Sequence, residues 1–124
     1  MTGFGGHGEG GLPAKRIDPR SVRFTHDSIR YTFKGGGTID DLAEGLRSGA
    51  IRAEDVEPIR LVEREGKLYT LDNRRLEAFR RAGVDVPYVL AHNMMSERAI
   101  LKEWRKRYTT SNEGVSIVVR GELK

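Results

Sequence analysis

Apolar and polar residues alternate with period two in two neighbouring stretches of this chain, residues 58–64 and residues 67–71. That period is typical of strands that bury one face. Glu65 and Gly66 lie between the two stretches, and a short connection that contains glycine favours a hairpin turn. The pattern therefore predicts a β-hairpin in the middle of the chain.

Three other stretches repeat their apolar residues with the spacing of an amphipathic helix. The first spans residues 38–49, where Thr38 and Asp41 predict a capping box and where a glycine ends the pattern. The second spans residues 73–82 and is also followed by a glycine. The third spans residues 96–107, with its first residue, a serine, as the predicted N-cap. The pattern therefore predicts three helices, which alternate along the chain with extended segments.

The remaining apolar stretches are short and rich in strand-forming residues. We expect extended structure over residues 17–33, a buried strand over residues 86–91 and a last strand over residues 115–119. A single turn of helix is expected over residues 53–56. This order of elements predicts a small domain of the α+β or α/β class, in which helices and strands share one core.

The first 15 residues show no periodic apolar pattern and hold six of the 15 glycines. Glycine-rich segments of this kind behave as flexible chains. We therefore expect a flexible leader over residues 1–15 and a single domain over residues 16–124. Such a leader would suit a domain taken from the end of a longer protein, and it lacks the apolar stretch of a signal peptide.

Composition narrows the classes of function that fit this chain. It has 22 basic and 18 acidic residues, a net charge of +4 and a pI near 9.6, which favours anionic partners such as nucleic acid or nucleotides. It has no cysteine, and its three histidines lack the spacing of a zinc site, so disulfides and structural zinc are not expected. No apolar run approaches the ~20 residues that a transmembrane helix needs, so no membrane partner is expected.

The most unusual local feature is a polar quartet where the predicted hairpin meets the second helix: Asp72, Asn73, Arg74 and Arg75. A helix N-terminus has unpaired N–H groups and a partial positive charge, so Asp72 can cap it, whereas two arginines there are mildly unfavourable. Guanidinium groups match the oxygens of a phosphate. The quartet therefore predicts either a phosphate site or a simple cap whose arginines are solvated and paired with Glu63 or Glu77.

The residues around this quartet resemble the core of the ParB/sulfiredoxin-like fold. The resemblance is carried by PIRLV and GKLYTLDNRRLEAFRRAGVDVPYV within residues 58–89, and it extends over residues 17–91. It implies an α+β domain with a short mixed sheet and three to four helices. It also places Arg74 and Arg75 on the family's basic pair, which holds the phosphates of nucleotides or nucleic acid.

Two departures from the family pattern change what the resemblance implies. Asp72 stands where the family usually has glycine, and Asn73 stands where it has glutamate, histidine or cysteine. The variant DNRRL and the closing TTSNEGVSIVVRG are similar to ParB-like domains at the C-terminal ends of bacterial polymorphic toxins, which are proposed nucleases. The resemblance thus implies a toxin-type nuclease, either a secreted effector that acts in the target-cell cytoplasm or a cytoplasmic protein, with an acidic immunity protein as candidate partner.

Residues outside the quartet extend the predicted site. His26 titrates near neutral pH and is a candidate general acid or base, and Ser28 is a candidate phosphate ligand from a neighbouring loop. Arg20 and Arg23 lie in a basic segment with interleaved aromatic residues, which suits single-stranded nucleic acid. The same aromatic residues also fit a hydrophobic core.

The combined prediction is a nuclease with four candidate catalytic residues and four candidate phosphate or substrate ligands. These are Asp72, Asn73, Arg74 and His26 for catalysis, and Arg75, Ser28, Arg23 and Arg20 for binding. The cofactor stays open, with Mg²⁺ held by Asp72 and Asp27 as the candidate, and no metal ligand is assigned. Two alternatives stay open as well: a nucleotide-dependent transferase or kinase, because other members of the resembled fold bind nucleoside triphosphates at this junction, and a non-catalytic module that binds DNA or a nucleotide.

Overall fold

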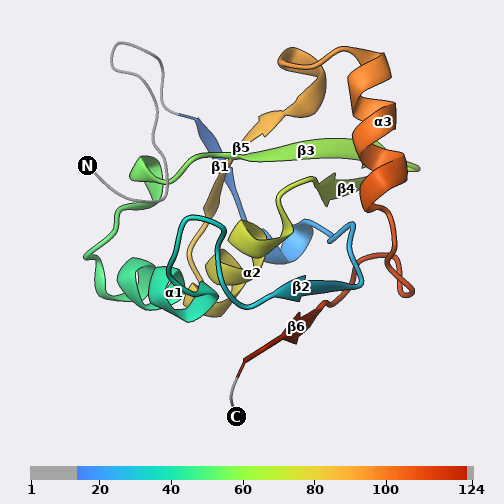
Figure 1. Ribbon diagram of the computed structural model, residues 1–124. Coiled ribbons are helices and arrows are strands. Elements are labelled where there is room, and N and C mark those ends of the chain that lie inside the picture. Colours follow the sequence, from blue (N-terminus) through green and yellow to red (C-terminus); the bar gives the residue numbers. More distant parts are fainter. Residues whose placement is uncertain (1–13, 123–124) are drawn as a thin grey trace.

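The computed structural model describes residues 14–122 and consists of short strands, three α-helices and three short 3₁₀ turns. The strands are Lys15–Ile17 (β1), Ser28–Arg30 (β2), Ile59–Arg64 (β3), Lys67–Thr70 (β4), Val86–Leu90 (β5) and Val118–Arg120 (β6). The α-helices are Ile39–Ser48 (α1), Asn73–Ala82 (α2) and Glu97–Arg107 (α3), and the 3₁₀ turns are Pro19–Ser21, Ala53–Asp55 and Ala91–Asn93. Figure 1 shows their arrangement.

The main sheet has the strand order β1-β5-β3-β4 and mixes both pairing directions. β3 pairs antiparallel with β4 and parallel with β5, and β1 pairs antiparallel with β5. The β3–β4 turn holds Glu65 at φ 53° and Gly66 at φ 77°, the two positive φ angles that a tight hairpin needs. The predicted hairpin and the α+β class with a short mixed sheet are therefore confirmed.

Helices α1 and α2 pack against each other and cover one face of the sheet (Figure 1). Thr38 Oγ1 accepts a hydrogen bond from the backbone of Asp41, and the Asp41 carboxylate accepts one from the backbone of Thr38, so the predicted capping box is present. Gly49 and Gly83 end the two helices in the left-handed conformation. The core between helices and sheet is made by buried side chains of both, among them Ile39, Leu42, Ile59, Leu61, Leu76, Phe79 and Val86.

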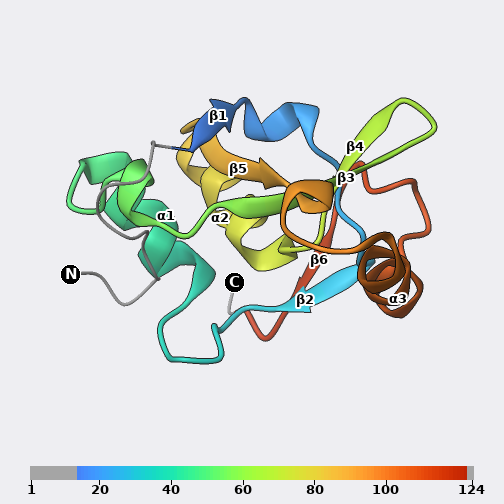
Figure 2. The ribbon, with the colours of Figure 1, turned by 90° about the horizontal axis from the view of Figure 1, so that it is seen from above.

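Helix α3 lies at the opposite end of the domain from α1, as Figures 1 and 2 both show. Ser96 caps it as the sequence predicts, accepting a hydrogen bond from the backbone of Ala99 at 3.1 Å. Its buried Ile100 joins a second small core with side chains that include Val62 of β3. Trp104 also packs edge-on against Tyr69 of β4, with ring centres 5.1 Å apart. These contacts fix the C-terminal end of α3 beside the end of the β3–β4 hairpin.

The last strand is displaced from its predicted range. It covers Val118–Arg120 rather than residues 115–119, and it pairs in parallel with β2 in a separate two-stranded sheet. Before it, the backbone N–H groups of residues 109 and 110 donate to the carbonyl of Thr25 at 2.9 and 3.0 Å, and Phe24 donates to the carbonyl of Gly114 at 2.9 Å. The C-terminal segment therefore runs alongside residues 23–28 and is hydrogen-bonded to them, an arrangement that the sequence pattern does not reveal.

Gly114 is required at this crossing for two reasons. Its φ is +75°, and a Cβ atom there would lie 2.1 Å from the carbonyl oxygen of Phe24. A side chain at this position would therefore combine backbone strain with a direct overlap.

The structure tests only some of the predictions for the N-terminal part of the chain. Residues 1–13 of the predicted leader lie outside the described residues, and Lys15 already begins β1. The extended stretch expected over residues 17–33 is divided between β1, a 3₁₀ turn and β2, and its two strands lie in different sheets. Within residues 14–122, every helix is too short or too polar to span a bilayer.

Candidate functional site

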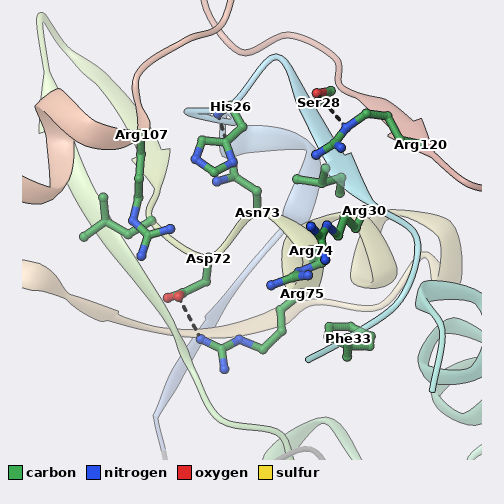
Figure 3. A pocket seen from close by; sticks show the side chains of 12 residues that line it. His26, Ser28, Arg30, Phe33, Asp72, Asn73, Arg74, Arg75, Arg107 and Arg120 are labelled. Atoms are coloured by element: carbon green, nitrogen blue, oxygen red, sulfur yellow. Dashed lines mark hydrogen bonds and ion pairs between the residues drawn. The ribbon is translucent and has the colours of Figure 1, made fainter. Parts of the chain in front are cut away.

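A hollow of about 380 Å³ opens beside the junction between β4 and α2. Figure 3 shows the side chains that line it, which come from β2, α2, α3, β6 and the segments next to them. Five of them are arginines: Arg30, Arg74, Arg75, Arg107 and Arg120. His26 and Ser28 share the same hollow. The predicted quartet is therefore one wall of a strongly cationic pocket.

The topology of the chain brings these arginines together from distant parts of the sequence. β2 and β6 pair in parallel with Arg30 opposite Arg120. Arg74 and Arg75 lie in the first turn of α2, and Arg107 is the last residue of α3. Like charges that share one pocket repel each other, and a bound anion relieves that repulsion.

Asp72 is the carboxylate of the pocket, and both of its oxygens are occupied. Oδ1 lies 2.9 Å from Arg60 Nη2 and 3.0 Å from Arg75 Nη2, as Figure 3 shows for Arg75, while Oδ2 accepts from Arg60 N at 2.8 Å and Nε at 3.1 Å. Burial raises the pKa of Asp72, but hydrogen bonds from Arg60 and the charge of Arg75 outweigh burial and lower the pKa overall. Asp72 is therefore an ionised group that holds two arginines in place.

The predicted capping role of Asp72 is wrong. Its side chain makes no capping hydrogen bond to α2. The reason is that Arg60, on the neighbouring strand β3, offers a charged fork and its own backbone N–H to the same carboxylate. This long-range pairing replaces the local cap.

Arg75 is held firmly at the rim of the pocket. Its guanidinium pairs with Asp72 at 3.0 Å and with Glu57 at 3.3 Å, and its side chain is 19% exposed. Its buried Nε has no hydrogen-bond partner among the described residues. The alternative pairing with Glu63 or Glu77 is not seen, since Glu57 and Asp72 take that place. The arginine is therefore oriented by acids rather than solvated.

Arg74 is held by an uncharged partner. Its Nη1 donates to the backbone carbonyl of Thr32 at 3.0 Å, and no carboxylate of the described chain lies within ion-pair distance. Burial, together with the charges of Arg30 and Arg107, lowers the pKa of Arg74. Its positive charge is therefore uncompensated and available to a ligand.

The other three arginines of the pocket differ in whether a carboxylate neutralises their charge. Arg107 is paired with Glu103 at 2.9 Å. Arg120 Nε donates to Ser28 Oγ at 3.1 Å (Figure 3), and neither Arg120 nor Arg30 pairs with a carboxylate of the described chain. Three guanidinium groups thus face the hollow without a counter-ion from residues 14–122, those of Arg30, Arg74 and Arg120.

His26 lies among these cations and is partly buried. Burial and the charge of Arg107 lower the pKa of His26, and the opposing charge of Asp27 does not outweigh them. Its imidazole is therefore neutral at neutral pH and can accept a proton. A bound phosphate would act in the opposite direction and raise this pKa, because a nearby anion favours the charged imidazole.

Asn73 is hydrogen-bonded to the backbone of the segment that carries this histidine. The residue is buried, its Oδ1 accepts from the backbone N–H of Thr25 at 2.8 Å and of His26 at 3.4 Å, and its Nδ2 donates to Thr25 Oγ1 at 3.0 Å. Asn73, a candidate catalytic residue in the sequence, thus uses its amide for hydrogen bonds to the segment that carries His26. Asn73 is a positioning residue in this arrangement.

The structure brings six of the eight predicted site residues into one place and separates the other two. The six are His26, Ser28, Asp72, Asn73, Arg74 and Arg75. Arg20 and Arg23 instead line a second hollow beside Arg80 and Arg81, and Arg23 donates to the carbonyl of Glu113 at 3.1 Å. They are therefore not part of the cationic pocket.

Three pocket arginines carry too weak a signal to be identified from the sequence. Arg30 and Arg107 stand out only as members of basic stretches, and Arg120 follows an apolar run without any distinguishing neighbour. Their convergence depends on the parallel pairing of β2 with β6 and on the direction in which α3 ends. Neither feature can be read from local spacing.

The candidate Mg²⁺ ligands do not form a metal site. The oxygens of Asp72 are occupied by Arg60 and Arg75, and Asp27 lies next to Thr109, whose Oγ1 is 3.4 Å from its Oδ1. In residues 14–122 no three histidine, aspartate or glutamate side chains are grouped so that they could hold a metal ion. The donor set therefore does not fit the hard cation considered from the sequence.

Comparison of the chain with protein-family models, with curated proteins and with solved structures found no match. The resemblance to the ParB/sulfiredoxin-like fold therefore stays a prediction.

Proposed function

We propose that this chain is a toxin-type nuclease that cleaves phosphodiester bonds of nucleic acid in the cationic pocket. One observation carries the proposal: Arg30, Arg74 and Arg120 face the hollow without a carboxylate partner from the described chain, and His26 lies among them. Cations of this kind bind a phosphate, and a neutral imidazole beside a bound phosphate can remove a proton from an attacking hydroxyl.

The chemistry of phosphodiester cleavage explains why such an arrangement would accelerate it. Negative charge builds up on the phosphate oxygens as the nucleophile adds to phosphorus. Guanidinium groups that are already oriented toward those oxygens stabilise this charge without reorganising. Asp72 contributes indirectly, because its ion pair at 3.0 Å fixes the guanidinium of Arg75. Asn73 contributes through its hydrogen bonds to the His26 segment.

A non-catalytic module that binds nucleic acid or a nucleotide is the second candidate, and one observation favours it. The ring of His26 makes no hydrogen bond within the described chain, whereas a general base is usually oriented by a partner. Substitution of Asp72 does not separate the two candidates, because binding and catalysis would both lose the orientation of Arg75. Substitution of His26 does separate them, because a binder does not need a base.

The proposal extends to the biological setting. We place the protein as a secreted effector that acts in the cytoplasm of a target cell, or as a cytoplasmic protein, and an acidic immunity protein is its expected inhibitor. The support for such an inhibitor is the net charge of +4 together with the cationic pocket. An acidic surface would be steered toward such a pocket and would compete with phosphate there.

The test uses the purified chain and labelled RNA and DNA oligonucleotides of mixed sequence. We expect cleavage by the parent, a loss of about 10²-fold in kcat/KM for Arg74→Ala and a loss of at least ~10²-fold in kcat for His26→Gln. Binding measured by fluorescence anisotropy should weaken in Arg74→Ala and change little in His26→Gln. The matched control is Arg105→Ala, an exposed arginine on α3 outside the pocket, which should cleave like the parent.

Two results would contradict the proposal. Binding without cleavage by the parent would favour the non-catalytic module. Equal cleavage by the parent and Arg74→Ala would show that the reaction does not take place in this pocket.

A further inference from the structure

The described pocket offers no activated nucleophile of its own. Ser28 Oγ accepts a hydrogen bond from Arg120 Nε at 3.1 Å, and neither an imidazole nor a carboxylate of the described chain is hydrogen-bonded to it. Asp72 is held by Arg60 and Arg75 through both oxygens. The chain has no cysteine. A covalent intermediate on this protein therefore has no support among the residues that line the pocket.

Attack by water is also poorly supported. The usual way to generate hydroxide at neutral pH is a bound metal ion, and the carboxylates of residues 14–122 do not form a ligand set for one. What the pocket does offer is one base, His26, and a group of cations. A single base is far more effective when the nucleophile is already attached next to the phosphate, because intramolecular attack reaches effective molarities on the order of 10⁵–10⁸ M.

We infer that the substrate of this pocket is RNA and that the ribose 2′-hydroxyl beside the bound phosphate is the nucleophile. The inference rests on the proposed nuclease function and adds to it the class of nucleic acid and the source of the attacking oxygen. DNA lacks the 2′-hydroxyl, so the same pocket would bind a DNA phosphate without a built-in nucleophile.

The step balances without a co-reactant. His26 accepts the proton of the 2′-hydroxyl, the 2′-oxygen forms a bond to phosphorus, and the bond from phosphorus to the 5′-oxygen of the next nucleotide breaks. The departing 5′-oxygen takes a proton from water, and the His26 imidazolium returns its proton to the hydroxide so formed. The products are one RNA end with a 2′,3′-cyclic phosphate and one end with a 5′-hydroxyl.

The surroundings of His26 suit this reaction. Arg74, Arg120 and Arg30 are placed to neutralise the extra charge of the five-coordinate phosphorus, since no described carboxylate competes for them. Phe33 and the mostly buried Ile29 add apolar atoms to the lining of the pocket. The hollow therefore combines cationic groups for a phosphate with some apolar lining.

The experiment compares three labelled oligonucleotides of the same mixed sequence with the purified full chain in the presence of EDTA. One is RNA, one is DNA, and one is DNA with a single ribonucleotide. We expect the RNA to be cleaved, the chimera to be cleaved only on the 3′ side of its ribonucleotide, and the DNA to react at least ~10³-fold more slowly. Mass spectrometry of the fragments should find 2′,3′-cyclic phosphate ends.

The controls separate this inference from the proposed function. His26→Gln should cleave RNA at least ~10²-fold more slowly while its binding of RNA, measured by anisotropy, changes little. Arg105→Ala should behave like the parent. Cleavage of DNA at a rate similar to RNA, or RNA fragments that lack cyclic phosphate ends from the earliest time point, would overturn the inference and leave the nuclease proposal standing. Cleavage that needs Mg²⁺ in place of EDTA would overturn the inference alone, and binding of all three oligonucleotides without cleavage under either condition would overturn both.

Discussion

Replacing Asp72 by asparagine should destabilise the fold as well as the pocket. The substitution keeps the size of the side chain but removes the charge that holds Arg60 and Arg75, whose side chains are 25% and 19% exposed. An amide retains one acceptor oxygen, so about two charge-assisted contacts are lost, each worth ~1.5–3 kcal/mol. Screening at these partly exposed arginines reduces that figure. We expect the free energy of unfolding at pH 7 to fall by ~2–4 kcal/mol, slightly less than for a fully buried pair.

Urea unfolding followed by far-UV circular dichroism measures this change. The matched control is Glu44→Gln, which removes the carboxylate that pairs with Arg47 on the exposed face of α1, where the Glu44 side chain is 68% exposed. Exposed pairs of this kind contribute little, so the control should lose no more than ~0.5 kcal/mol. The difference between the two variants isolates the effect of burial and of the bidentate contact.

The pH dependence of the same measurement is a second check. The pKa of Asp72 is lowered in the folded state, so on acidification the unfolded chain takes up its proton first, near pH ~3.9. The stabilisation by Asp72 is therefore complete above that pH and disappears as the pH falls through the lowered folded pKa. The stability gap between the parent and Asp72→Asn should close in acid. A gap below ~0.5 kcal/mol at pH 7, or one that is the same at pH 7 and in acid, would refute the reasoning.

Three further predictions concern positions outside the lining of the pocket. Gly114→Ala should lower the free energy of unfolding by at least ~2 kcal/mol because of its φ of +75° and the overlap at 2.1 Å, whereas Gly35→Ala, which has open space, should stay within ~0.5 kcal/mol of the parent in the same urea titration. Asp27→Asn should move the acid limb of the pH–rate profile to lower pH, because the charge of Asp27 raises the pKa of His26 and cleavage is lost once that imidazole is protonated. An acid limb that stays in place would contradict this coupling between Asp27 and His26. Arg80→Lys should cost ~2–4 kcal/mol, since the guanidinium donates to three backbone carbonyls at 3.1, 3.0 and 2.6 Å and an ammonium cannot reach all three; a variant as stable as the parent in thermal unfolding would contradict this.

Most of the elements could be predicted because their signals are local. The capping box of α1, the glycines that end α1 and α2, and the Glu65-Gly66 turn are each set by residues within a few positions of one another. The same holds for the quartet at the start of α2, whose position at a strand–helix junction is as predicted. Local chemistry therefore gives the elements and one wall of the pocket.

The partners of these side chains could not be predicted, because they come from distant parts of the chain. Asp72 has the sequence position of a helix cap, but Arg60 of the adjacent strand offers it a stronger contact. Arg20 and Arg23 have the composition of a nucleic-acid segment, but the backbone between them and β2 turns their side chains toward a different hollow. Sequence spacing identifies side chains that can bind phosphate, but the topology determines which of them come together in one pocket.

Because the C-terminal segment is hydrogen-bonded to residues 23–28, formation of the pocket depends on the order in which a ribosome makes the chain. Arg120 reaches the pocket through the pairing of β6 with β2, and the carbonyl of Thr25 is bound by the backbone of residues 109 and 110. At a synthesis rate of roughly 5–20 residues per second, residues 109–120 are made several seconds after residues 23–28. A nascent chain thus lacks both Arg120 and the support of the His26 segment. The pocket is completed only once residues 109–120 have emerged from the ribosome, which is itself made of RNA.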